Sequence, residues 1–431
     1  MCTLLKKWCI IMLLKKLRTV LERYMDLSKE AIDSKGYLDS SKEKSKDFTR
    51  NRKMPFPKLI KFMLTRVKGS TQNALEKYFD KLGEDVHMTQ QAFSEARSKL
   101  KVYAFSHLFY LTARIAYDGY YDTFRGYRVT AIDGSKIALP DIDLLGRIYG
   151  TMGADSSSPT AQGSICYDVL NKVIVDAQIE PLATDERTLA LCHIKNMEKS
   201  RRFDKELIIM DRGYPSFGFI KELQKENIAF LMRVKRGFNK DIDAQTESDG
   251  TVVLRKEGND DITIRVIKIL LSSGETETLI TSLIEKDMSI DDFKELYFMR
   301  WPVEIKFDEV KNKLEIENFT GNSKKAIEQD FFATMYLANI AAAAWWEAQA
   351  KVEKEREGKD NKYEYRVNVN HEIGVLKDRL IYVLAGNNAA KEVEKIIWLL
   401  AKRVCAVKPG RSFKRKAPRK SKFHWNLRRN C

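Results

Sequence analysis

The sequence predicts an α/β protein with an all-α region before its mixed core and a helical region after it. Three observations predict this class. Helical periodicity dominates the N-terminal part, short β-branched runs alternate with helical segments after Tyr120, and a helical pattern returns near Ile290. The chain has 431 residues, of which 44% are hydrophobic and 32% are charged. This balance is typical of a globular protein with about two to four domains.

The first expected region, residues 1–120, is helical. Helical patterns run over 4–24 and 57–82, and a Lys- and Arg-rich linker over 42–53 separates them. The apolar run 8–14 is too short for a signal peptide and is followed by basic residues, so it is expected to belong to an amphipathic helix. No stretch approaches the roughly 20 apolar residues that a membrane span requires. We therefore expect no association with a membrane.

Two short helical segments in this region, 70–82 and 89–100, have the spacing of a helix-turn-helix. If the pair reads DNA, the second helix contacts base edges or phosphates. The expected DNA-binding residues there are Gln90, Gln91 and Arg97. A plain helical pair with a polar face is the alternative interpretation.

The mixed core is expected in two parts, 121–235 and 286–350, separated by a β-rich insertion over 236–285. The first part predicts elements in the order β, ββ, α, β, α, β. Their ranges are 127–132, 164–167, 173–179, 185–200, 207–210, 216–225 and 228–234. The strands expected in the insertion are 251–255, 262–271 and 276–284.

The helical pattern that resumes at Ile290 runs past Lys313, and Pro302 is expected to kink or split it. The last expected region, 351–431, is helical and ends in a flexible basic tail. The helices expected after Lys313 are 325–355, 371–384 and 389–402.

Basic residues gather at both ends of the chain, whose net charge is +16. Residues 1–100 contain 22 Lys and Arg against 12 Asp and Glu, and residues 402–431 contain 12 against none. The residues between them carry the remainder, 16 − 10 − 12 = −6. Basic ends around an acidic middle predict a polyanion-binding protein. The alternative is a soluble enzyme with solvated Lys-rich ends.

The six cysteines are scattered and form no CxxC pair. This spacing encodes neither a zinc site nor a disulfide framework. A reducing compartment, the cytoplasm, is therefore expected.

Two aspartates occupy equivalent places in the predicted core. Asp133 and Asp211 each close a predicted strand, and Gly134 and Gly213 follow them closely. Glycine permits a sharp turn that leaves the carboxylate exposed at the end of the strand. Taken alone, either aspartate could be only a turn former or a helix cap.

A third carboxylate belongs to a polar stripe in the helical stretch after Ile290. The four residues of the stripe are Tyr297, Arg300, Glu304 and Lys311. Their spacings of 3, 4 and 7 place them within about 60° on one helix face. Trp301, Ile305 and Leu314 are expected to make the helix partly buried, so the stripe would face a cleft, with Asp308 as a supporting acid. Ordinary ion pairs on a solvated helix face are the alternative.

Three carboxylates from separate elements are what a protein needs to hold two divalent cations about 3.5–4 Å apart for phosphodiester chemistry. Oxygen ligands suit Mg²⁺ or Mn²⁺. In this interpretation Asp133, Asp211 and Glu304 are the metal ligands. The two cations of the stripe bind phosphates, and its tyrosine donates a hydrogen bond.

These residues resemble the DDE transposases of the insertion-sequence-4 type. Residues 131–135 and 210–214 resemble the first and second acidic motifs, and Tyr297-x2-Arg300-x3-Glu304-x6-Lys311 reproduces the Y-R-E-K signature. The resemblance covers about residues 52–340. It implies an RNase H-like catalytic core, a mixed sheet flanked by helices, with a β-strand insertion before the helix that carries Glu304.

The resemblance also implies roles for individual residues. Asp133, Asp211 and Glu304 would be catalytic metal ligands, and the other three signature residues would contact phosphates at the transposon ends. Some relatives use a Trp in the insertion to hold a flipped base during hairpin formation. Residues 236–285 contain no Trp, which leaves the hairpin step open.

The sequence thus predicts a transposase that binds terminal inverted repeats, cuts DNA at the element ends and joins the 3′-OH ends to target DNA. A homodimer is expected in the DNA complex. Two alternatives remain open: a catalytically silent DNA-binding protein derived from a transposase, and a stand-alone RNase H-like nuclease.

Overall fold

The computed structural model describes residues 19–50, 52–65, 70–119, 121–153, 157–200, 203–271, 274–285, 287–386 and 388–408. Most of the helix expected over 4–24 lies outside the described residues, and so does the basic tail after Lys408. The chain forms two compact units. One consists of residues 116–309, and the other combines residues 1–115 with residues 310–431.

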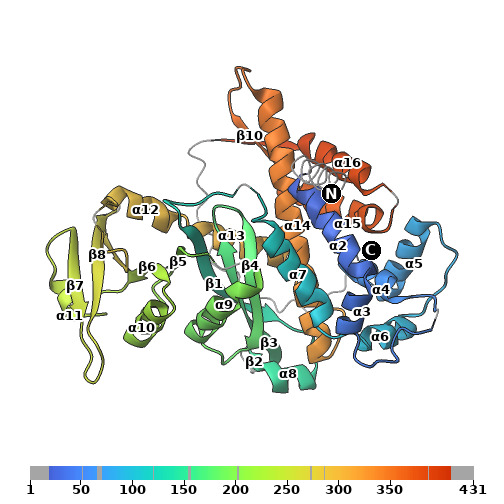
Figure 1. Ribbon diagram of the computed structural model, residues 1–431, viewed down its shortest axis with the longest axis horizontal. Coiled ribbons are helices and arrows are strands. Elements are labelled where there is room, and N and C mark those ends of the chain that lie inside the picture. The colour runs from blue at the N-terminus through green and yellow to red at the C-terminus, as the bar shows by residue number, and fades with distance from the viewer. Residues whose placement is uncertain are drawn as a thin grey trace, which may run out of the picture. The chain divides into compact units, whose positions relative to one another are not determined.

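The unit of residues 116–309 is built on a nine-stranded sheet (Figure 1). Helices connect several of its strands along the sequence. Its strands are β1 (Arg128–Ala138), β2 (Thr151–Met152), β3 (Ser158–Asp168), β4 (Val173–Pro181), β5 (Glu206–Met210), β6 (Ala229–Val234), β7 (Asp249–Leu254), β8 (Ile262–Leu270) and β9 (Thr276–Thr281). Its helices are α8 (Asp143–Tyr149), α9 (Glu186–Ser200), α10 (Phe217–Lys225), α11 (Lys240–Ala244), α12 (Ile290–Phe298) and most of α13 (Trp301–Asn312).

The central strands have the connectivity of an RNase H-like fold, as expected. β1, β3 and β4 form an antiparallel meander, β5 pairs parallel to β1, and β6 pairs parallel to β5. The spatial order is therefore β4-β3-β1-β5-β6, with α9 connecting β4 to β5 and α10 connecting β5 to β6. Helix α9 packs against β4, β3 and β1. This arrangement brings the carboxyl ends of the parallel strands β1, β5 and β6 to one edge.

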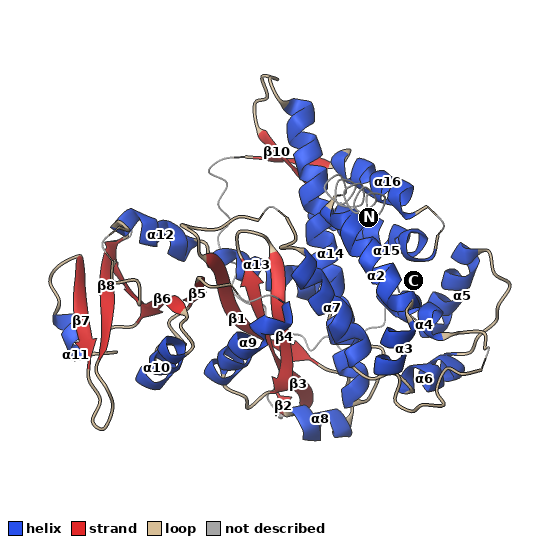
Figure 2. Cartoon of the chain, in the orientation of Figure 1, coloured by secondary structure: helices blue, strands red, loops and turns tan. Residues whose placement is uncertain are grey.

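The three strands predicted in the insertion are present, and they extend the core sheet. β9 pairs antiparallel with β6, and β8 and β7 follow as the next two strands (Figure 2). The apolar side chains of β8 alternate with polar ones at its start, as in a strand with one buried face. The insertion thus adds three strands beyond β6 before the chain enters α12.

The second unit is mainly helical. Its helices are α2 (Val20–Asp33), α3 (Lys35–Ser41), α4 (Phe56–Thr65), α5 (Thr71–Leu82), α6 (Gln90–Ser98), α7 (Tyr103–Ile115), α14 (Lys324–Arg356), α15 (Val369–Ala385) and α16 (Ala389–Ala401). The long helix α14 packs against α7, α15 and α16. In the described part of the chain, no helix combines the length and the apolar content that crossing a membrane requires.

Two details of this unit matter for its expected role. The Phe62 ring of α4 meets Tyr78 of α5 and Phe93 of α6 edge-on, at centroid distances of 5.2 and 5.1 Å. These contacts hold the predicted helix pair 70–82 and 89–100 together. The C-terminal region is not wholly helical as expected, because β10 (Glu364–Val367) and β11 (Val404–Val407) form a small antiparallel sheet.

A buried ion pair fastens the first residues of β1 and β5 to each other. Arg128 donates to Glu206 through Nε at 2.9 Å and Nη2 at 2.5 Å, and the two side chains are 0% and 1% exposed. The guanidinium also lies over the rings of Phe203 and Tyr117, at 4.6 and 5.3 Å from their centroids. A bidentate pair in this environment is costly to break, because either charge alone would remain buried without a partner.

We predict that Glu206→Gln lowers the free energy of unfolding by about 3–5 kcal/mol, since it leaves the Arg128 charge uncompensated. The double variant Arg128→Met/Glu206→Leu is expected to lose less, because it removes both charges and keeps apolar volume. Urea unfolding followed by circular dichroism measures both changes. A Glu206→Gln protein as stable as the wild type would show that the pair does not anchor these strands.

Candidate active site

The parallel register of β1 and β5 brings Asp133 and Asp211 to one edge of the sheet. Ala131 of β1 pairs with Ile209 of β5. Each aspartate lies two residues after one member of this pair. Asp211 directly follows β5, as predicted. Asp133 does not close its strand as expected, because β1 runs on to Ala138. Beyond the parallel pairing, antiparallel pairing with β3 continues β1.

The glycines after the two aspartates serve a different purpose from the expected sharp turn. Neither has a positive φ, and Gly134 is an ordinary strand residue paired with Ser164. A Cβ on Gly134 would lie 2.8 Å from Gln162 Nε2 and 3.3 Å from Glu186 Oε1. The missing side chain of Gly134 therefore leaves room beside Asp133 for the ends of these two side chains.

The polar stripe is divided between two helices. Tyr297 lies in the last turn of α12, Arg300 lies in the link, and Glu304 and Lys311 lie on α13. The break confirms the expectation for Pro302, which occupies the first turn of α13, where its missing N–H costs nothing.

The helix α13 is partly buried as expected, and Leu314 just beyond it is 4% exposed, but two of the residues expected to make its buried face do not. Trp301 and Ile305, predicted to be buried, are 42% and 64% exposed, whereas Arg300 is only 7% exposed. The buried apolar face of the helix is made by Val303, Phe307 and Val310. Their spacing of four and three residues is a regular helical face, which sets the orientation of the helix.

Electrostatics show that the carboxylates from separate elements are neighbours. Burial is the main cause that raises the pKa of Asp133 to about 6. The carboxylates of Glu304 and Glu186 contribute to the rise, and the Arg300 guanidinium opposes it. Burial likewise raises the pKa of Tyr297 to about 12, with Asp211 adding to the effect and Arg300 opposing it. The three predicted carboxylates thus share one neighbourhood around Arg300.

Arg300 is held by its surroundings but keeps one donor free. Its Nη1 forms an ion pair with Glu304 at 2.8 Å, and its guanidinium lies over the rings of Trp301 and Tyr297 at 5.3 and 5.8 Å. The buried Nε of Arg300 and the buried hydroxyl of Tyr297 have no hydrogen-bond partner. Two unsatisfied donors beside a group of carboxylates indicate a place where an oxygen-rich ligand would bind.

The donor set fits a hard divalent cation. Asp133, Asp211 and Glu304 offer only carboxylate oxygens, which Mg²⁺ and Mn²⁺ prefer. In the described part of the chain no three His, Cys, Asp or Glu side chains are already gathered as a metal-ligand group, and Glu304 pairs instead with Arg300. Three carboxylates beside one guanidinium leave an excess of negative charge that a divalent cation would neutralise.

A buried series of hydrogen bonds through His193 supports β1 at Asp133. No sequence pattern predicts this series. The ring nitrogens of His193 on α9 contact Asp176 Oδ2 at 2.6 Å and Ser164 Oγ at 2.8 Å, and that serine donates to the Asp133 carbonyl at 3.2 Å. His193 and Asp176 are 0% exposed and Ser164 is 1% exposed. A substrate cannot reach this Ser-His-Asp set, so its arrangement positions the backbone and does not serve as a nucleophile.

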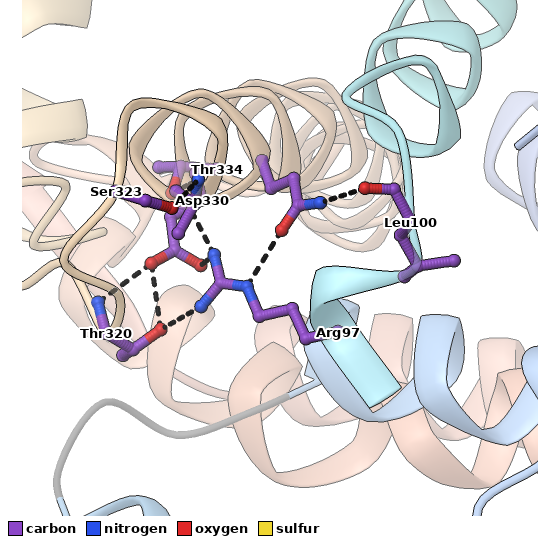
Figure 3. A network of polar contacts seen from close by, with 8 residues as sticks. Arg97, Leu100, Thr320, Ser323, Asp330 and Thr334 are labelled. Carbon is purple, nitrogen blue, oxygen red and sulfur yellow. Dashed lines mark hydrogen bonds and ion pairs between the residues drawn. The ribbon is translucent and has the colours of Figure 1, made fainter. Parts of the chain in front are cut away.

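Of the three residues expected to contact DNA on the predicted helix pair, Gln90 and Gln91 are exposed at the start of α6. The expectation for Arg97 is wrong, because its side chain is only 5% exposed. Its guanidinium donates to Gln329 Oε1 at 2.8 Å and Thr320 Oγ1 at 2.9 Å (Figure 3).

The same guanidinium forms an ion pair with Asp330 at 3.0 Å, and Asp330 is 4% exposed. Gln329 in turn donates to the Leu100 carbonyl at 2.8 Å. This network fastens the end of α6 to α14 (Figure 3). A cation so enclosed is not available to a phosphate, and its role is structural.

Lys311 forms a loose ion pair with Glu317 at 3.7 Å, and about a quarter of its side chain is exposed. Asp308, the expected supporting acid, is exposed. The Arg300–Glu304 pair has the i,i+4 spacing of the alternative interpretation, but Arg300 is buried and does not lie on a solvated face. The Lys311–Glu317 pair joins the last turn of α13 to a residue beyond the helix.

Residues 124–340, just over half of the chain, match the family described as "Transposase DDE domain". A curated protein of Sinorhizobium fredii (strain NBRC 101917 / NGR234), named "Putative transposase y4zB", is 28% identical over 151 residues, a match that covers 31% of this chain and 42% of that protein. The match thus spans less than half of that relative. A cryo-EM structure of the piggyBac transposase synaptic complex with hairpin DNA has a TM-score of 0.48 and 12% identity, covering 90% of this chain and 87% of that one. Because the family match extends over half of the chain and includes both aspartates and the Y-R-E-K residues, this protein belongs to the DDE transposase family.

Proposed function

We propose that the protein binds the terminal inverted repeats of an insertion sequence, cleaves DNA at the element ends and joins the 3′-OH ends to target DNA. The observation that supports this most strongly is the placement of Asp133, Asp211 and Glu304. The register of β1 and β5 puts the two aspartates at the same end of the sheet, and Glu304 is close enough to contribute to the raised pKa of Asp133.

In this proposal the three carboxylates hold Mg²⁺ or Mn²⁺. When bound, two such ions activate water or a 3′-hydroxyl and stabilise the leaving oxygen of a phosphodiester. The chain fixes the ligands in different ways. Asp133 is held within a continuous strand that the buried His193 chain supports, and Asp211 follows the last residue of a fully buried strand.

Arg300 and Tyr297 would position the DNA backbone. The Arg300 Nε and the Tyr297 hydroxyl are donors without partners, and phosphate oxygens are acceptors that match both. Lys311, on the last turn of α13, would add a more exposed contact. These donors orient a strand without reading its sequence.

Recognition of the element ends is assigned to the helical N-terminal region, residues 1–120. The exposed Gln90 and Gln91 at the start of α6 are the candidate base-reading residues. The ten Lys and Arg residues of the tail 408–431 would add affinity for any DNA sequence. A homodimer on paired element ends and a location with cytoplasmic DNA complete the proposal.

We predict that Asp133→Asn, Asp211→Asn and Glu304→Gln each lower end cleavage by more than about 100-fold, because each removes a ligand charge and misplaces the reacting groups. The assay uses a duplex that carries the DNA flanking this gene, with Mg²⁺ or Mn²⁺, and chelation by EDTA should abolish cleavage. A folded variant that cuts at the wild-type rate would remove its residue from the site.

We predict that Arg300→Ala loses most end cleavage and strand joining while still binding Mn²⁺, since the guanidinium positions phosphate and does not ligate metal. Arg300→Lys should recover only part of the activity, because an ammonium lacks the planar fork of donors. Lys311→Ala is expected to have a smaller effect. Near-normal cleavage and joining by Arg300→Ala would show that its pairing with Glu304 is purely structural.

We predict that Mn²⁺ binding by the wild-type protein strengthens between pH 5 and pH 7. With a pKa of about 6, Asp133 is mostly protonated below that pH, and a protonated carboxyl is a poor ligand. Affinity should therefore fall by up to about tenfold for each pH unit below about 6. Mn²⁺ titrations at several pH values measure this. Asp133→Asn should lack this component, and an unchanged pH profile in that variant would assign the titration elsewhere.

A further inference from the structure

Glu186 occupies the space between the two aspartate motifs. It is the first residue of α9, which follows β4. Its Oε1 lies 3.3 Å from the position that a Cβ on Gly134 would take, and its Oε2 lies 3.5 Å from the corresponding position on Gly213. One carboxylate thus lies near the chain just after Asp133 and two residues after Asp211.

The first turn of α9 is fixed to the second motif, which keeps Glu186 in this place. Arg187 donates from Nε to the Tyr214 carbonyl at 2.9 Å and from Nη2 to the Gly213 carbonyl at 3.1 Å. Asp185 accepts hydrogen bonds from the backbone N–H groups of Arg187 and Thr188, at 3.0 and 3.4 Å. The side chains of Asp185 and Arg187 thus make hydrogen bonds that hold the local structure. The Glu186 carboxylate makes no such hydrogen bond with the residues that the structure describes.

A buried hydroxyl without a partner lies in the same neighbourhood. Tyr214 is 2% exposed, and its hydroxyl makes no hydrogen bond. Burial raises the pKa of Tyr214, and Glu186, Asp133 and Asp211 are the next causes that raise it. A hydroxyl in the field of three carboxylates, with no hydrogen-bond partner of its own, indicates that a polar ligand belongs among them.

The charge balance points the same way. When ionised, the carboxylates of Asp133, Asp211, Glu186 and Glu304 carry four negative charges, and the guanidinium of Arg300 pairs with Glu304. Glu186 itself has no hydrogen bond and no ion pair with the residues that the structure describes. The Glu186 side chain is exposed to solvent, and a divalent cation bound beside it would relieve the repulsion between the neighbouring negative charges.

We propose that Glu186 is a fourth carboxylate of the divalent-cation site, contributing together with Asp133 and Asp211. This inference rests on the proposed metal-dependent function. Glu186 could instead act only as an acidic residue in the first turn of α9, where it favours the helix dipole. That simpler role would affect the stability of α9 and leave cation binding unchanged.

The test is the binding of Mn²⁺ alone, measured on the purified full chain by electron paramagnetic resonance of the free ion. Glu186→Gln keeps the shape of the side chain and removes its charge. We expect Glu186→Gln to lower Mn²⁺ affinity by at least about tenfold, in the range seen when residues around a metal are removed. Glu186→Asp is expected to recover part of the affinity.

Glu198→Gln is the matched control, because it removes an exposed carboxylate from the same helix about 18 Å further along. It should bind Mn²⁺ like the wild type. Asp133→Asn serves as the variant that tests the main site. Thermal unfolding of each variant without metal shows whether a change in affinity reflects a loss of fold.

Wild-type Mn²⁺ affinity in Glu186→Gln, with weakened binding in Asp133→Asn, would overturn this inference and leave the proposed function standing. A wild-type protein that binds no Mn²⁺ and cuts no DNA would overturn the proposed function itself. A Glu186→Gln protein that loses Mn²⁺ affinity only in proportion to a lowered melting temperature would also overturn the inference.

Discussion

The parallel pairing of β1 with β5 is the constraint on which the candidate site depends. In this register Arg128 opposes Glu206, Ala131 opposes Ile209, and the two aspartates follow at the same edge of the sheet. The buried Arg128–Glu206 pair opposes a slip of one residue, because a slip would separate two buried charges that form a bidentate ion pair. A slip would also turn Asp133 to the other face of the sheet.

The contacts around Asp133 hold it in a fixed position on β1. β1 continues past it because β3 pairs with both its halves, so the aspartate belongs to a rigid strand and not to a loop. The His193 chain reaches the Asp133 carbonyl through Ser164, from residues with almost no exposure. Gly134 leaves room for Glu186 on the other side. A functional side chain held by such supporting contacts stays close to one geometry.

The element order and the acidic positions could be predicted because they depend on local pattern. The runs before Asp133 and Asp211, the split at Pro302 and the three strands of the insertion are all visible in short windows of sequence. The continuation of β1 could not be predicted, since Asp-Gly-Ser-Lys reads as a turn until β3 pairs with it. The role of Arg97 was equally hidden, because its partners Gln329 and Asp330 lie more than 230 residues away along the chain.

The ion pair of Arg300 with Glu304 joins a residue proposed to contact phosphate to a residue proposed to hold the cation. A guanidinium has five donors in a fixed plane, and one of them, Nη1, holds the carboxylate while the buried Nε has no partner. Arg300 can therefore keep Glu304 oriented and still offer a donor to a phosphate oxygen. Because Arg300 is only 7% exposed, its charge is poorly screened, and a phosphate beside it would be strongly favoured. In the proposed function, the same residue would couple the position of the Glu304 carboxylate to the arrival of the DNA strand, which a lysine with a single charged nitrogen could not do.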